Sequence, residues 1–139
     1  MLQAPNLYYN RVIEYPTDDV ERCRDYFRLL GRSIPEVWTD VRAFDRTWLK
    51  GSFEDARTWS LANPDKVLWF GEFGTIRHTP AASRVAYMRD SVSIAKEFGF
   101  PYCVWNYCST PNDGNRFSLV DDDTRKFLSQ DLLDACLGL

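Results

Sequence analysis

One stretch of the sequence limits the fold more than any other: residues 67–74, an apolar run of strand length that ends in a single carboxylate, Glu72, between two glycines. A helix-start signal and an apolar stripe at helical spacing follow over residues 79–99. A second strand-forming run follows over residues 102–107. A strand, a helix and a strand in this order predict two parallel strands joined by a right-handed crossover.

The rest of the chain continues this alternation. We predict these further elements: a strand over residues 6–15, a helix over 18–31 that starts with Asp18 and Glu21 as a capping box, a short strand or an extended loop over 34–41, a loop with a helical turn over 42–50, a helix over 52–62 and a last helix from about Asp122. The expected buried faces are Phe53, Ala56, Trp59 and Ala62 in the helix over 52–62, and Leu128, Leu132, Ala135 and Cys136 in the last helix.

This order of elements sets the expected fold class. Units of about thirty residues that alternate in this way are typical of parallel α/β folds. Candidate strands start near residues 6, 34, 66 and 102, which predicts (β/α)4, a single domain over residues 1–139. Because a full eightfold barrel takes ~250 residues, four units make about half of one. We therefore predict a half (β/α)8 barrel, with a small open α/β sheet as the alternative.

The composition excludes several classes of partner. Hydrophobic residues make up 45% of the 139 residues and charged residues 27%, which fits a globular protein with a sizeable core. The net charge of −3 offers no basic surface, so neither nucleic acid nor a membrane is expected as a partner. No apolar run approaches the ~20 residues of a membrane span, and the N-terminus lacks a signal-peptide pattern. We expect a cytoplasmic protein if the chain is whole, and a secreted one if it is trimmed.

The cysteines and the histidine predict neither a disulfide framework nor a metal site. The four cysteines lack C-x-x-C spacing and are too few for a disulfide scaffold, so we expect free thiols. Cys23 and Cys136 fall on apolar faces of predicted helices, where a thiol packs as a small hydrophobic group. His78 has no second histidine with which to form a zinc site. We therefore expect no metal and no cofactor.

Glu72 is the strongest candidate for a functional side chain. It lies at the carboxyl end of a predicted strand, and in parallel α/β folds this end of the sheet carries ligands and catalytic groups. The flanking glycines allow backbone or ligand to come close to the acid. An exposed glutamate at a strand end, without a function, is the alternative interpretation.

Four parts of the sequence together resemble a known family. They are the run 67–74, Arg84 in the helix that follows, the run 98–107 and the run 117–121. In this combination they resemble the C-terminal part of a family-five glycoside hydrolase, and the resemblance covers about residues 50–139. These enzymes, cellulases and related β-glycanases, are eightfold barrels. The resemblance therefore implies a TIM-barrel fold and a hydrolase that degrades polysaccharide.

The resemblance also implies roles for three side chains. Glu72 takes the position of the catalytic nucleophile at the end of the seventh strand, and Trp105 takes that of the eighth-strand tryptophan that lines the sugar-binding cleft. Tyr107 shares the face of Trp105 if strand alternation continues, and its hydroxyl can then hydrogen-bond sugar hydroxyls. The implied ligand is a β-glucan or another β-linked oligosaccharide.

The second carboxyl group of such a site is missing from the expected place. A retaining glycosidase uses two carboxyl groups ~5–5.5 Å apart, one as nucleophile and one as acid and base. In the family the acid follows an asparagine, and this sequence contains no Asn-Glu pair. Val12 and Glu14 stand where the family has a histidine and a tyrosine on its sixth strand. Glu14 is the candidate for a substitute acid and base, and a solvated glutamate at a strand end is the alternative.

Two functions therefore stay open. In the first, the chain is a cellulase-like glycosidase that is completed by a second copy of itself or by a complementary barrel half. In the second, it is a carbohydrate-binding or structural half-barrel without catalysis. A half-barrel has unpaired strand edges, and we expect Leu68 and Phe70 to face inward without an opposing wall. Both features predict a homodimer. If each chain has four strands, two copies form an eight-stranded barrel and two Glu72 side chains enter one shared cleft; a dimer of two open sheets packed face to face, without a shared site, is the alternative.

Overall fold

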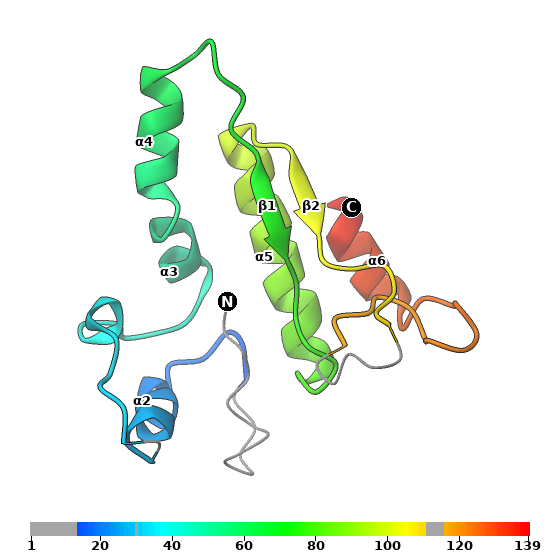
Figure 1. The fold of residues 1–139 in the computed structure, drawn as a ribbon, viewed down its shortest axis with the longest axis horizontal. Coiled ribbons are helices and arrows are strands. Elements are labelled where there is room, and N and C mark those ends of the chain that lie inside the picture. The colour runs from blue at the N-terminus through cyan, green and yellow to red at the C-terminus, as the bar shows by residue number, and fades with distance from the viewer. Residues whose placement is uncertain (1–13, 30, 111–115) are drawn as a thin grey trace.

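A computed structural model describes residues 14–29, 31–110 and 116–139. The predicted first strand, apart from its last two residues, and the loop at residues 111–114 lie outside this part. The elements, in chain order, are α2 (Val20–Leu29), a 3-10 helix (Glu36–Trp38), α3 (Arg46–Gly51), α4 (Glu54–Ala62), β1 (Phe70–Phe73), α5 (Ala81–Phe98), β2 (Tyr102–Val104) and α6 (Gln130–Leu137). Figure 1 shows α5 lying along the two strands, with α6 beside it.

The strands β1 and β2 are parallel neighbours, and the chain passes from one to the other through α5. The paired residues are Phe70 with Tyr102, Glu72 with Cys103, and Phe73 with Val104, with a shift of register between Phe70 and Glu72. This arrangement confirms a mixed α/β fold with a parallel sheet. The described residues contain two strands, so the four strands of a half-barrel are not confirmed.

α5 lies at the centre of the apolar core because other elements cover it on several sides. Its predicted stripe is confirmed, since Met88, Val92 and Ala95 are at most 1% exposed. The stripe packs with Phe73 of β1 and with Leu132, Ala135 and Cys136 of α6. Gly99 then adopts a left-handed backbone, which ends the helix and turns the chain into β2.

Leu68 and Phe70 do not face an open interior, and this prediction is wrong. Both pack against the buried cluster of Leu49, Ile94, Phe98 and Phe100, and Phe70 also stacks on Phe73 with ring centroids 4.7 Å apart. Helices therefore cover these two side chains in part. The exposed apolar residues of the same segment are Val67 and Trp69, which are 83% and 59% exposed.

The segment 34–41 forms no strand. Pro35 precedes the 3-10 helix Glu36–Trp38, in which the N–H of Trp38 donates to the carbonyl of Pro35 at 2.9 Å. The helical turn expected within 42–50 is the helix α3, because the Asp45 side chain caps its N-terminus by accepting the N–H of Trp48.

The helix starts shift from the predicted positions where a different side chain provides the cap. Asp19 rather than Asp18 accepts the N–H of Arg22 at 3.3 Å at the start of α2, while Glu21 pairs with arginines of its own helix. The last helix begins at Gln130 rather than near Asp122, because the Ser129 hydroxyl accepts the N–H of Leu132 at 3.1 Å.

Two predicted apolar faces are buried only in part. Leu128 lies before α6 and is 46% exposed, whereas Leu132, Ala135 and Cys136 are buried as predicted. In α4, Trp59 is 48% exposed and no residue is buried. None of the elements in the described part covers the side of α4 that carries Trp59.

The four cysteines are free thiols, as predicted, and Cys23 and Cys136 are buried. Burial raises the pKa of both thiols to about 11, so they are protonated at neutral pH. Within the described ranges, no group of three or more His, Cys, Asp and Glu side chains is placed to hold a metal ion. No helix in the same ranges is long and apolar enough to cross a membrane.

Candidate functional site

Glu72 and Trp105 lie at the same end of the sheet, where β1 and β2 have their carboxyl ends. The strands are parallel, and Phe73 pairs with Val104 as the last residue pair of the ladder. The N–H of Trp105 then donates to the carbonyl of Phe73 at 2.7 Å. Glu72 therefore precedes this hydrogen bond on one strand, and Trp105 follows the end of the other.

The Glu72 side chain is exposed on the sheet face that α5 does not cover. Its neighbour Phe73 is buried against α5 and α6, and successive side chains of a strand point to opposite faces. No described residue donates a hydrogen bond to the Glu72 carboxylate or pairs with it. Because the carboxylate has no internal partner among these residues, it is available to a ligand.

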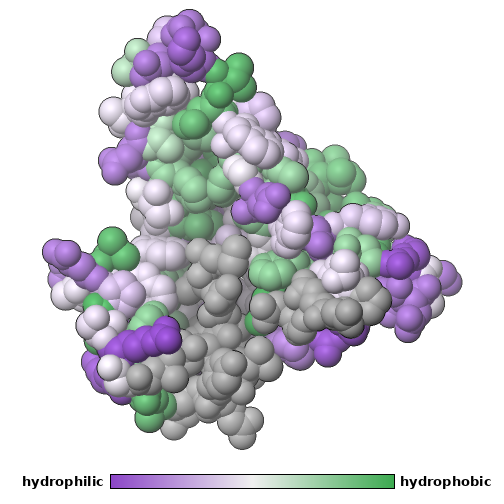
Figure 2. Space-filling model, viewed as in Figure 1, coloured by the Kyte–Doolittle hydropathy of each residue, from purple (hydrophilic) through white to green (hydrophobic). Residues whose placement is uncertain are grey.

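A pocket of about 340 Å³ lies beside Glu72, between β1 and α4. Its lining is mostly apolar and includes Leu68, Trp69, Phe70, Glu72 and, across the pocket, Phe53. Figure 2 shows the apolar surface gathered between α4 and β1 in the upper half of the view. Glu72 is the only carboxylate among the residues that line this pocket, so the acid sits at the margin of an apolar hollow.

Gly74 brings the main chain of Trp105 against the end of β1. A Cβ atom on Gly74 would lie 1.9 Å from the carbonyl oxygen of Trp105 and 3.3 Å from the ring of Phe117. The other flanking glycine, Gly71, has open space where its Cβ would be. The close approach expected of the two glycines is therefore required at Gly74 alone.

Trp105 is 40% exposed and follows the last residue of β2. The peptide bond between Trp105 and Asn106 is cis. Asn106 is fixed on both sides: its carbonyl accepts the N–H of Leu119 at 3.1 Å, and its side-chain oxygen accepts the Ser109 hydroxyl at 3.2 Å. The residue after Trp105 is thus fixed, while part of the indole ring is accessible.

Tyr107 is 57% exposed, and its ring meets Phe127 edge to face with centroids 6.3 Å apart. β2 ends at Val104, before Trp105 and Tyr107. Strand alternation therefore does not place Tyr107 on the same face as Trp105. Its hydroxyl has no hydrogen-bond partner among the residues that the structure describes.

Glu14 precedes a residue that is anchored to α5, the helix that follows Glu72. The following residue, Tyr15, donates its N–H to the Ser83 hydroxyl at 2.9 Å in the first turn of α5. The Tyr15 hydroxyl donates to Asp90 at 2.8 Å, and burial together with this carboxylate raises the pKa of Tyr15. Glu14 itself is exposed. The chain that carries Glu14 is thus anchored to the helix that follows Glu72.

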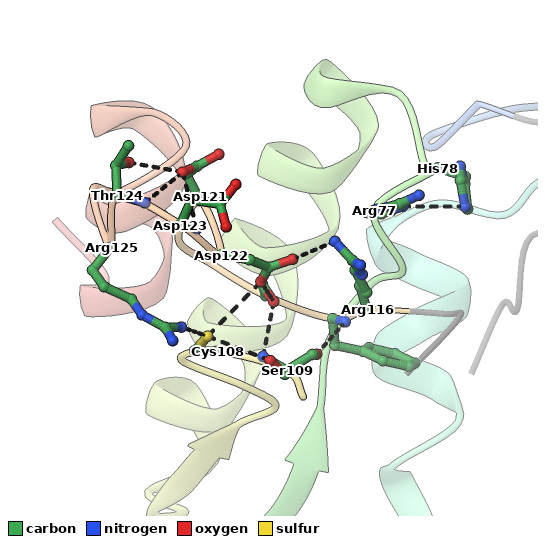
Figure 3. Close-up of polar contacts among 12 residues, drawn as sticks. Arg77, His78, Cys108, Ser109, Arg116, Asp121, Asp122, Asp123, Thr124 and Arg125 are labelled. Carbon is green, nitrogen blue, oxygen red and sulfur yellow. Dashed lines mark hydrogen bonds and ion pairs between the residues drawn. The ribbon is translucent and has the colours of Figure 1, made fainter. Parts of the chain in front are cut away.

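A polar network behind the site was missed at the sequence level. Asp122 accepts the Ser118 hydroxyl at 2.8 Å and Arg116 at 2.7 Å, and Ser118 in turn accepts the N–H of Ser109 at 2.9 Å. Figure 3 shows Asp122 facing Arg116 on one side and Cys108 on the other. The hydrogen bond from Ser118 and the charge of Arg116 hold the pKa of Asp122 below its usual range.

Arg84 joins the two halves of this region. It is buried at 7% exposure, and it donates from Nε to the Thr75 hydroxyl at 3.2 Å and from Nη2 to the carbonyl of Ser118 at 2.9 Å. Burial lowers the pKa of the guanidinium. Arg84 therefore links the loop after β1 to residue 118, which precedes the residue that hydrogen-bonds the chain after Trp105.

Comparison with solved structures shows what this arrangement resembles. A hyperthermophilic endo-β-1,4-glucanase in complex with substrate aligns at 26% identity with a TM-score of 0.57, over 68% of this chain and 28% of its own. Thermotoga maritima Cel5A in complex with mannotriose aligns at 25% identity with a TM-score of 0.56, over 86% and 34%. The protein has a cellulase-like fold. It spans about a third of the length of these enzymes.

A more distant neighbour shows the fold alone. The cellulose synthase subunit CcsZ of Clostridioides difficile aligns at 22% identity with a TM-score of 0.55, over 66% of this chain and 28% of its own. No protein-family profile matches the chain. No curated protein matches it either.

Proposed function

We propose that the protein is a cellulase-like glycoside hydrolase part whose exposed sheet end binds a β-linked oligosaccharide, with Glu72 in the position of the nucleophile. The observation that carries this proposal is the pairing of an exposed carboxylate, Glu72, with a partly exposed indole, Trp105, at one end of a parallel sheet. Flat indole rings suit the apolar face of a pyranose, and a neighbouring carboxylate suits its anomeric carbon.

The solved neighbours suggest the class of ligand. Structures of Thermotoga maritima Cel5A contain cellobiose or mannotriose as the bound substrate. A short oligosaccharide with β-linked glucose or mannose units is therefore the ligand that we propose for this chain. A site built mainly from one indole and one carboxylate can accept both glucose and mannose units.

The proposed reaction requires one group more than Glu72. A Glu72 oxygen attacks the anomeric carbon, the bond from that carbon to the leaving oxygen breaks, and a second carboxylic acid gives its proton to the leaving oxygen. The same group then takes a proton from the water that hydrolyses the glycosyl-enzyme ester. Glu14 is our candidate within the chain, because the residue after it is hydrogen-bonded to the first turn of α5, the helix that follows Glu72.

Binding without catalysis is the second candidate function. It is favoured by the absence of an Asn-Glu pair from the sequence. In this case Trp105 and Tyr107 hold a sugar, while Glu72 serves only as a hydrogen-bond acceptor.

Replacing Trp105 by alanine tests the proposed site. We expect the affinity for cellotetraose to fall by about 1–3 kcal/mol, because an aromatic contact and its buried area are lost. Isothermal titration calorimetry measures the change. Trp59→Ala is the matched control, since Trp59 has a similar exposure and is not among the residues that line the pocket beside Glu72. Equal losses in both variants, or no loss in Trp105→Ala, would remove the indole from the site.

We further propose that a second copy or a complementary barrel half covers the free side of the sheet. In the described part, β1 has a strand neighbour on one edge only, and Val67 and Trp69 are exposed beside it. An unpaired strand edge next to apolar side chains favours association. A twofold pair would bring two Glu72 side chains into one cleft and so supply a second carboxyl group. Light scattering should give twice the mass of one chain, and a monomer mass at micromolar concentration would contradict the pair.

A further inference from the structure

The segment that carries Trp105 and Tyr107 is held by separate hydrogen bonds rather than by a strand ladder. β2 ends at Val104, so residues 105–109 lack regular pairing. The N–H of Leu119 donates to the carbonyls of Asn106 and Tyr107, at 3.1 and 3.3 Å. The N–H of Trp105 also donates to the carbonyl of Phe73 at 2.7 Å, and that of Asn106 to the carbonyl of Phe117 at 3.5 Å. Main-chain hydrogen bonds therefore hold residues 105–107, and side-chain contacts hold the residues that follow.

The side-chain contacts form a relay of buried hydroxyl groups. Ser109 and Ser118 are 7% and 4% exposed. The Ser109 hydroxyl donates to the Asn106 side chain at 3.2 Å and accepts the N–H of Phe117 at 3.0 Å. The N–H of Ser109 donates to the Ser118 hydroxyl at 2.9 Å. The Ser109 hydroxyl is thus both donor and acceptor, and the main-chain N–H of Ser109 joins the two serines.

Asp122 ends this relay and orients the Ser118 hydroxyl. Its Oδ1 accepts the Ser118 hydroxyl at 2.8 Å, and its Oδ2 accepts Arg116 at 2.7 Å. A carboxylate can only accept, so the Ser118 hydroxyl must point to Asp122 and keep a lone pair for the N–H of Ser109. Hydrogen bonds to a charged acceptor are stronger than neutral ones, and chains of them reinforce one another.

We propose that Asp122, acting through Ser118 and Ser109, positions Trp105 and Tyr107 for the binding of a β-linked oligosaccharide. This inference rests on the proposed function of the site. Asp122 touches no sugar in this arrangement. Its effect passes through the Ser118 hydroxyl to the main-chain N–H of Ser109, and the Ser109 hydroxyl in turn holds Asn106, the residue between the two aromatic residues. Asp122 is therefore a positioning residue, and the neighbouring Asp121 and Asp123 lie outside the relay.

Asp122→Ala tests the proposal, and Asp123→Ala is its matched control. Asp123 carries the same charge one residue further along the chain, and its exposed side chain takes no part in the relay. We expect the dissociation constant for cellotetraose to rise about tenfold in Asp122→Ala, on the scale of one lost charge-assisted hydrogen bond, and to stay within about twofold in Asp123→Ala. Asp122→Asn keeps the shape and one acceptor oxygen, so an intermediate affinity is expected.

Fluorine NMR separates positioning from general loss of structure. The chain has five tryptophans, and 5-fluorotryptophan labelling gives one signal for each, with Trp105→Phe assigning that of Trp105. We expect Asp122→Ala to shift the Trp105 signal and to leave the other four in place. A general loss of structure would move the signals of the half-buried Trp38 and Trp48 as well, and would overturn the proposal.

The outcomes distinguish this inference from the function on which it rests. If the parent protein binds cellotetraose and Asp122→Ala binds it equally well, the positioning role is wrong and the proposed function stands. If the parent protein does not bind cellotetraose, the proposed function fails. An unchanged Trp105 signal in Asp122→Ala contradicts the relay whether or not the parent binds sugar.

Discussion

Replacing Glu72 by glutamine should abolish any hydrolysis of β-glucan by the protein while leaving its affinity for cellotetraose nearly unchanged. The amide has the shape of the carboxylate but cannot form the glycosyl ester, so the rate should fall by roughly a thousandfold or more. Stability should not change, because the exposed Glu72 side chain has no partner among the described residues. Release of reducing sugar, calorimetry and thermal unfolding measure the three quantities.

Glu54→Gln is the matched control for this change, because Glu54 is an exposed glutamate in the first turn of α4, away from the sheet end. Its activity should equal that of the parent protein. Parental activity in Glu72→Gln would refute the catalytic role. Absence of hydrolysis in the parent together with sugar binding would favour the second candidate function, a carbohydrate-binding half-barrel.

Gly74→Ala should lower the free energy of unfolding by about 3 kcal/mol, the upper part of the range for forcing an extra group into a packed region. The added Cβ would lie 1.9 Å from the Trp105 carbonyl oxygen, and main chain on both sides cannot give way as a flexible side chain would. Either β1 or the segment after β2 must therefore move, so sugar affinity should fall as well. Urea unfolding followed by tryptophan fluorescence measures the stability.

Gly71→Ala is the control for Gly74→Ala because it makes the same change on the other side of Glu72. No atom lies within 4 Å of a Cβ at Gly71, and its backbone is not left-handed. Its stability should equal or slightly exceed that of the parent protein, since alanine reduces the freedom of the unfolded chain. Equal stabilities of the two alanine variants would show that the contact between Gly74 and Trp105 does not constrain the site.

The sequence predicts the part of the fold that depends on repeated patterns. The stripe of Met88, Val92 and Ala95 has a clear helical period, and the run that contains Glu72 has the length of a strand. Together they predict β1, α5 and β2 and the end of the sheet at which Glu72 lies. The parallel pairing follows from the crossover rule.

The rest of the fold depends on local or long-range contacts that have no period. The start of α6 moves to Gln130 because Asp121 folds residues 121–124 into a turn, with its side chain accepting the N–H of Thr124 at 2.8 Å, and because Ser129 then provides the cap. Leu68 points to the helices because the register of β1 shifts between Phe70 and Glu72. Such a shift is not visible in the pattern of apolar residues.

The sequence likewise predicts some residues of the candidate site and not others. Glu72 and Trp105 were predicted from their places after two strand-length runs and from the resemblance to glycosidases. The contact of Gly74 with the Trp105 carbonyl and the relay from Asp122 to Ser109 were missed, because each joins residues whose proximity depends on the folded chain. Serines and an aspartate in a polar segment carry no sequence signal that separates a buried relay from a solvated loop.

The most direct measurement of the central claim is a titration of the labelled protein with cellotetraose, followed by the backbone amide signals in NMR. The proposed site predicts saturable shifts at residues 72–74 and 105–107, near Glu72 and Trp105. It predicts no shifts at residues 36–48, the segment that lines a separate hollow. Shifts confined to residues 36–48, or no shifts at millimolar sugar, would contradict a carbohydrate site at the carboxyl ends of β1 and β2.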